Sequence, residues 1–156
     1  MDFLFSFAEN ESAMKIFIPF FTFMFLSAGV YAAGCSTVEE MDTADTVASS
    51  VKDWSDINSF FHKFKECDDG YIAEGLSDTI PRMLAENWNT ATQLKAMTDK
   101  DKSFDAWILN HVNTTSASKD LELIIKNSNE KCADNAQAFC QKMASAANQA
   151  LQALKE

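Results

Sequence analysis

Residues 71–88 read YIAEGLSDTIPRMLAENW. The large apolar residues of this stretch recur at intervals of four, at Ile72, Leu76, Ile80, Leu84 and Trp88. Side chains four positions apart lie on one face of an α-helix, so the stretch predicts an amphipathic helix. Gly75 and Pro81 interrupt the stripe. The helix therefore either kinks, or breaks and restarts with the proline in its first turn, where proline is tolerated.

The same helical spacing continues through residues 33–156. Few residues there break a helix, and no stretch alternates apolar and polar residues with period two, as a strand would. We therefore expect an all-α fold, a compact bundle of about six or seven helices stapled by disulfides, with no repeat that would indicate a solenoid. The side chains expected to cap these helices are Ser36 in a capping box with Glu39, Ser55, Asp68 and Asp69, Ser118, and Asp134.

An export signal is predicted near the N-terminus. The apolar run at residues 16–26 follows a lysine and precedes a small-residue cleavage site, which are the parts of a signal peptide. We expect residues 14–32 to be that signal, residues 1–13 to be an extension from a mis-assigned start before Met14, and residues 33–156 to be a single α-helical domain. The run is short for a membrane span, and a retained anchor is the alternative.

All four cysteines lie beyond the predicted cleavage point, at Cys35, Cys67, Cys132 and Cys140. An even number in an exported chain indicates two disulfides. We favour Cys35–Cys67, across an antiparallel helix pair, and Cys132–Cys140, which closes a short loop. Eight helical steps would separate the second pair by about 12 Å, so the chain must bend before the helix that bears Cys140. Lipidation of Cys35, as in a bacterial lipoprotein, is the alternative.

No motif in the chain predicts catalysis, a cofactor or a metal. The sequence has no nucleophile elbow, zinc-protease helix, phosphate loop or dinucleotide-binding glycine pattern, and its cysteines lack the spacing of a zinc site. We expect His111 to be half-buried and bonded to a backbone carbonyl or water, and His62 to be exposed. Glu74 and Asp78 would be neighbours on a helix, as an acid–base pair requires, but solvated helix charges explain them more simply.

Charge limits the partners that this chain can meet. After signal cleavage the net charge is about −8, which repels nucleic acid and anionic lipid and suits either a soluble protein or one with a basic protein partner. Residues offered for such a contact are Trp54, Asp68, Asp69, Glu74 and Asp78. For Trp54 we favour a second interpretation, in which the indole staples a helix junction.

These features favour a binding protein over an enzyme. We expect a small periplasmic or secreted protein that binds another protein, as an inhibitor or an immunity protein against an envelope-directed toxin. One alternative is an acid/base hydrolase that uses Glu74, Asp78 or His111. The other is a carrier of an apolar small molecule between its helices. The aromatic side chains that would line the carrier site are Phe60, Phe61, Phe64, Trp88, Phe104 and Trp107.

Overall fold

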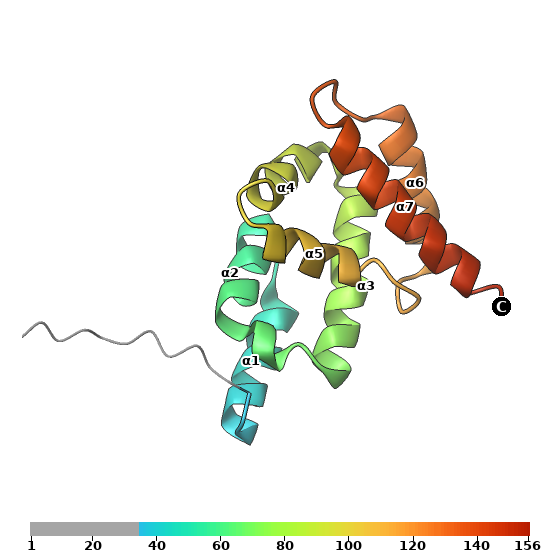
Figure 1. The fold of residues 1–156 in the computed structure, drawn as a ribbon. Helices are drawn as coiled ribbons and strands as arrows, with labels where there is room; N and C mark the ends of the chain where they lie inside the picture. Colours follow the sequence, from blue (N-terminus) through green and yellow to red (C-terminus); the bar gives the residue numbers. More distant parts are fainter. Residues whose placement is uncertain (1–34) are drawn as a thin grey trace, which may run out of the picture. The chain divides into compact units, whose positions relative to one another are not determined.

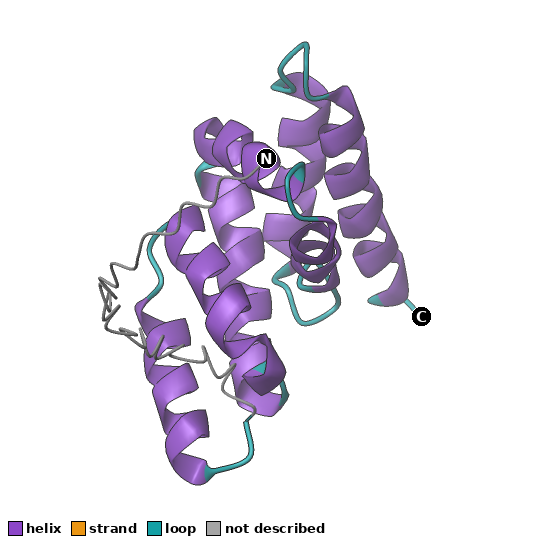
Figure 2. Cartoon of the chain, turned by 60° about the vertical axis from the view of Figure 1, so that its left-hand side comes forward, coloured by secondary structure: helices purple, strands orange, loops and turns teal. Residues whose placement is uncertain are grey.

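The computed structural model describes residues 35–156. In this part of the chain seven α-helices and two short 3-10 helices occur without a strand, which confirms the all-α prediction (Figure 1, Figure 2). The signal peptide expected at 14–32 and the extension at 1–13 lie outside the described residues. In chain order the helices are α1 (Val38–Ser50), α2 (Trp54–Phe64), η1 (Lys65–Cys67), α3 (Gly70–Glu86), η2 (Trp88–Thr90), α4 (Ala91–Thr98), α5 (Lys102–Asn110), α6 (Ser118–Glu130) and α7 (Gln137–Ala153).

Helix α3 lies at the centre of the helical arrangement. The first turns of α3 pack against α1, and its later turns pack against α6 (Figure 1). Helices α6 and α7 lie side by side as an antiparallel hairpin. Four residues of the predicted stripe face the core, each at most 1% exposed: Ile72, Leu76, Ile80 and Leu84. The helix continues unbroken through Pro81, so of the two alternatives the break does not occur.

Aromatic side chains fill the core between α2 and α5. The ring centroid of Phe61 lies 5.2 Å from that of Phe104 and 5.3 Å from that of Trp107. Phe60 stacks on Trp107 with centroids 6.2 Å apart. Contacts of this kind stabilise a core beyond the area that they bury. Phe60, Phe61, Phe104 and Trp107, which the carrier hypothesis placed around a ligand, therefore pack against one another, whereas Trp88 lies apart from them in η2.

The helix caps at the start of the domain fall close to the predicted positions. Thr37, not Ser36, is the N-cap of α1, and its capping-box partner is Glu40. Asp53, not Ser55, caps α2, because its carboxylate accepts from the backbone N–H groups of the second and third helical residues. The cap of α3 is Asp69.

The two last helices begin without a side-chain cap. Ser118 is the first residue of α6, and the N-cap position belongs to Ala117. Helix α7 begins at Gln137 with Ala136 at its N-cap, so the cap expected at Asp134 is wrong by two positions. Alanine lacks the side-chain oxygen that made serine and aspartate attractive candidates. The two helices instead pack closely against each other.

Both predicted disulfides are present. Cys35 and Cys67 join the start of α1 to η1 with their Cα atoms 4.9 Å apart. Cys132 and Cys140 lie 6.1 Å apart across the bend that precedes α7, as the distance argument required. The disulfide occupies the sulfur of Cys35, which leaves no thiol there for a lipid. Within residues 35–156, no helix combines the length and the apolar character needed to cross a bilayer.

Candidate functional site

A buried polar cluster joins three segments that are distant in the sequence. Asp68 follows η1, Ser77 lies midway along α3, and His111 directly follows α5. The Nδ1 atom of His111 lies 2.9 Å from Ser77 Oγ, and its Nε2 atom lies 3.0 Å from Asp68 Oδ2. Ser77 and His111 are each 3% exposed. We call these three residues the relay.

Two further side chains donate hydrogen bonds to the relay. An ionised carboxylate only accepts hydrogen bonds, so Asp68 Oδ2 accepts from His111 Nε2 and also from the indole Nε1 of Trp107 at 2.6 Å. On its other side, Nδ1 of His111 and Oγ of Ser77 share a hydrogen bond at 2.9 Å, in which Ser77 donates when the imidazole is neutral with its proton on Nε2. Asn113 Nδ2 in turn donates to Ser77 Oγ at 3.1 Å.

The relay has the residue types of a hydrolase triad but lacks two features that hydrolysis requires. Ser77 is buried, so a substrate carbonyl has no path to its oxygen. It also lies inside α3, where the neighbouring backbone N–H groups bond within the helix and cannot form an oxyanion hole. The arrangement instead fixes the turn after η1 against the end of α5. Our expectation of a half-buried His111 bonded to a backbone carbonyl or water is corrected, because two side chains hold it.

The sequence offered no signal for this cluster. Asp68 lies 43 positions from His111, and Ser77 lies 34 positions from it. Only tertiary packing brings such residues together. Asp68 followed by Asp69 resembled a pair of equivalent caps, yet the two carboxylates have separate roles. Asp69 accepts from the N–H of Gly70, whose positive φ of 51° favours glycine at this tight turn.

The structure separates the residues predicted to contact a partner. Trp54 is 1% exposed, and its Nε1 donates to Thr90 Oγ1 at 2.8 Å, so its indole is a core element and offers no surface. Asp68 belongs to the relay. Asp69 and Glu74 are exposed and remain available.

Asp78, the last of these residues, is exposed and forms an ion pair with Arg82 at 2.6 Å. Its predicted catalytic partner, Glu74, is also exposed. His111, in contrast, is buried. Glu74, Asp78 and His111 therefore do not meet in one accessible pocket. The hydrolase alternative therefore has no geometric support from this group.

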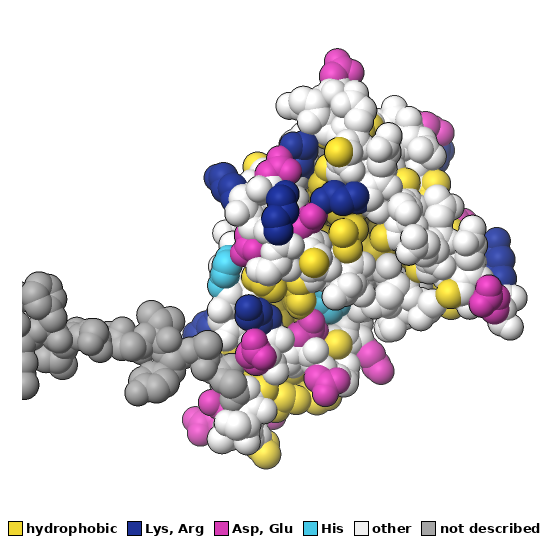
Figure 3. Space-filling view, in the orientation of Figure 1, with side chains coloured by type: hydrophobic (Ala, Val, Ile, Leu, Met, Phe, Trp, Pro, Cys, Tyr) yellow, Lys and Arg dark blue, Asp and Glu magenta, His cyan; other side chains and the backbone are white. Residues whose placement is uncertain are grey.

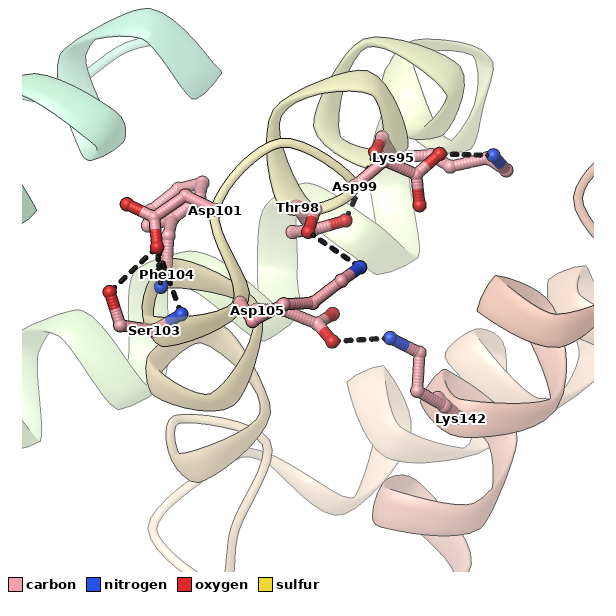
Figure 4. A network of polar contacts seen from close by, with 9 residues as sticks. Lys95, Thr98, Asp99, Asp101, Ser103, Phe104, Asp105 and Lys142 are labelled. Carbon is pink, nitrogen blue, oxygen red and sulfur yellow. Dashed lines mark hydrogen bonds and ion pairs between the residues drawn. The ribbon is translucent and has the colours of Figure 1, made fainter.

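A second polar network joins α4, α5 and α7 (Figure 4). Asp101 caps α5, and hydrogen bonds from the Ser103 hydroxyl and the Phe104 backbone N–H lower the pKa of its carboxyl. A hydrogen bond from Lys95 likewise lowers the pKa of Asp99. Lys142 of α7 reaches Asp105 of α5 at 2.5 Å. The network holds helix ends in place. Among residues 35–156, no three histidine, cysteine or acidic side chains gather as metal ligands would.

The strongest surface feature is a segregation of charge. Residues 35–78 contain 11 acidic and 3 basic side chains, whereas residues 79–156 contain 9 of each. The acidic side chains gather over α1 and the first turns of α3, in the lower part of Figure 3. We call this surface the acidic end and define it by the exposed residues Glu39, Asp42, Glu66, Asp69 and Glu74.

Comparison with known proteins finds no matching family model, no similar curated protein and no similar solved structure.

Proposed function

We propose that this protein binds another protein outside the cytosol and that the acidic end contacts a basic surface of that partner. The segregation of charge carries the proposal. The described chain owes its net negative charge to residues 35–78. Complementary potentials steer two proteins together and raise their association rate more than their affinity.

The two disulfides support the proposed compartment. Such bonds persist in the periplasm and outside the cell, where thiols are oxidised. All four cysteines of the chain are used in these bonds. The predicted export signal agrees with this location.

The disulfide near the acidic end also supports its role in binding. Cys35–Cys67 ties the start of α1 to η1, next to Glu39 and Glu66. Charges held on a rigid surface lose less conformational entropy when the partner binds. The finer role that we propose is that of an inhibitor or an immunity protein, which acts by occupying a partner's surface and needs no chemistry of its own.

Charge reversal at the acidic end tests the proposal. The variant is Glu39→Lys/Glu66→Lys/Glu74→Lys, and the matched control Glu122→Lys/Glu130→Lys/Asp134→Lys makes the same charge change on the α6–α7 hairpin. Each protein is used to capture partners from envelope extract, and association rates are then measured with the captured partner. We expect the acidic-end variant to associate about tenfold more slowly at low salt than the control. Equal rates for both variants, or no captured partner, would refute the proposal.

A further inference from the structure

A groove beside α7 has a lining unlike the rest of the protein surface. Its volume is about 720 Å³, and it lies between the end of α6, the bend after it and the outer side of α7. None of its lining residues is charged, although charged residues make up 23% of the chain. Six side-chain amides line it: Asn129, Gln137, Gln141, Asn148, Gln149 and Gln152. We call this feature the amide groove. The area over α7 is correspondingly mostly white in Figure 3.

A buried hydroxyl in the same groove has no partner. Ser128 is 5% exposed, and its Oγ makes no hydrogen bond with any described residue. A buried polar atom without a partner costs free energy that a ligand group can restore. Ser128 itself lines the groove. This atom is independent of the amides, and it points to an occupant that offers hydrogen-bonding groups.

The spacing of the polar residues matches an extended polypeptide. Gln137, Gln141, Ser145 and Gln149 follow one another at intervals of four along α7. Four helical residues rise by about 6.0 Å. Two residues of an extended chain advance by about 6.6 Å. The main-chain groups on one side of an extended segment therefore repeat at nearly the same interval as the polar side chains along α7. A segment that lies along α7 can place one residue in every two beside each of these side chains.

The chemistry of the lining selects the same occupant. A side-chain amide carries both a donor and an acceptor, so it can pair at once with the C=O and the N–H of one residue of an extended chain, which point to the same side. The absence of charged side chains from the lining disfavours phosphate groups and charged peptides. No aromatic ring lines the groove on which a sugar ring could stack. The Cys132–Cys140 disulfide forms part of one wall and makes that wall rigid before binding.

We propose that the amide groove binds an extended, uncharged peptide segment of another protein through its main chain. This contact is separate from the acidic end and does not depend on it. A partner could engage either surface alone, or both in turn. The amide side chains would pair with the N–H and C=O of alternate residues of the segment, and Ser128 Oγ would complete its hydrogen bonding with one of these groups.

Peptide display on the disulfide-bonded protein tests this proposal. A library of random nine-residue peptides is selected on the wild-type protein, and enriched peptides are measured against Gln141→Ala/Asn148→Ala. The matched control, Gln93→Ala, removes an exposed amide from α4. We expect uncharged peptides to be enriched and to bind the groove variant about tenfold more weakly, since two hydrogen bonds are lost, with no change for the control.

Two further probes separate main-chain recognition from other modes. Enriched peptides that are N-methylated at alternate residues lose the N–H donors and should no longer bind. Chitotetraose serves as an uncharged glycan probe. Binding of chitotetraose that is lost in the groove variant, binding of methylated peptides at full strength, or no peptide that depends on the groove would each overturn the proposal. The charge-reversal variant of the acidic end should bind the enriched peptides normally, which keeps the two tests distinguishable.

Discussion

The Nε2 atom of His111 lies 3.0 Å from Oδ2 of Asp68, although 43 positions separate the two residues. The same oxygen accepts the indole N–H of Trp107 at 2.6 Å. One carboxylate thus satisfies two N–H donors in the interior. The side chain of Asp68 is itself only 12% exposed, so water cannot readily replace it.

Replacing Asp68 should therefore destabilise the protein. In Asp68→Ala both donors lose their acceptor, and we expect the free energy of unfolding to fall by about 2–3 kcal/mol. Urea denaturation followed by circular dichroism measures this loss. The control is Glu66→Ala, which removes an exposed carboxylate two positions earlier and should change stability by less than about 0.5 kcal/mol. Equal losses in the two variants would show that the relay does not hold the structure.

Trp54 should behave as a core residue. Trp54→Phe keeps an aromatic ring but removes the N–H that donates to Thr90 Oγ1 at 2.8 Å, and it reduces the buried volume. We expect a loss of about 1–2 kcal/mol in the free energy of unfolding. Tyr71→Ala is the control, because Tyr71 is 52% exposed and its removal should leave stability nearly unchanged. A Trp54→Phe protein as stable as the wild type would contradict the assignment.

The helices and the Cys132–Cys140 disulfide could be predicted because their causes are local, whereas Cys35–Cys67 was predicted from the antiparallel pairing of two consecutive helices. The spacing of Ile72, Leu76, Ile80 and Leu84 is a property of one helix, and all four are buried as expected. The short separation of Cys132 and Cys140 forces a bend that the structure contains. Cap positions are harder to predict because several adjacent residues carry suitable oxygens and packing decides among them.

The polar sites could not be predicted because their causes are not local. The relay depends on the fold that brings α3 and α5 together, and nothing near His111 in the sequence identifies Asp68 as its partner. The amide groove similarly depends on how α6 lies against α7. Its residues alternate with the core residues of α7, so the sequence indicates only an ordinary amphipathic helix.

The two disulfides should stabilise the protein unequally. Cys35–Cys67 spans 32 positions and Cys132–Cys140 spans 8. In the chain-entropy model, the larger loop stabilises by about 3.7 kcal/mol and the smaller by about 2.5 kcal/mol. We expect Cys35→Ser/Cys67→Ser to lose more stability than Cys132→Ser/Cys140→Ser when both are measured by thermal unfolding. The reverse order would show that effects in the native state outweigh the entropy of the unfolded chain.

Acid should weaken the start of α1 through Glu40. Hydrogen bonds from the backbone N–H and hydroxyl of Ser36, followed by those from Thr37, lower the pKa of the Glu40 carboxyl below its ordinary value of 4.5. A lowered pKa in the folded state means that the stabilisation is complete above about pH 4.5 and is lost as the pH falls through the lowered value.

The matching experiment compares Glu40→Gln with wild type across that range. We expect the variant to be the less stable protein at pH 7 and the difference to shrink toward pH 3, as measured by urea denaturation at each pH. Glu39→Gln removes a charge from the same turn without altering the capping box and serves as the control. A difference between Glu40→Gln and wild type that stays constant from pH 7 to pH 3 would contradict the assigned role.

Two ion pairs of equal length should contribute unequally because they differ in burial. Lys142 meets Asp105 and Lys95 meets Asp99, each at 2.5 Å, but the carboxylate side chain is 12% exposed in the first pair and 55% in the second (Figure 4). Oδ1 of Asp105 is also buried without a partner. Removing Lys142 would therefore leave a carboxylate with no partner in a largely dry site.

We expect Lys142→Met to lower the free energy of unfolding by about 1–2 kcal/mol, less than for a fully buried pair because the lysine itself is 40% exposed. Lys95→Met should cause no measurable change, since water replaces the lysine at an exposed carboxylate. A double-mutant cycle with Asp105→Asn isolates the pair: the double variant should recover part of the loss, because an amide needs no counter-charge. If Lys142→Met and Lys95→Met prove equally stable, burial of Asp105 does not govern this contact, and α7 is held against α5 by apolar packing alone.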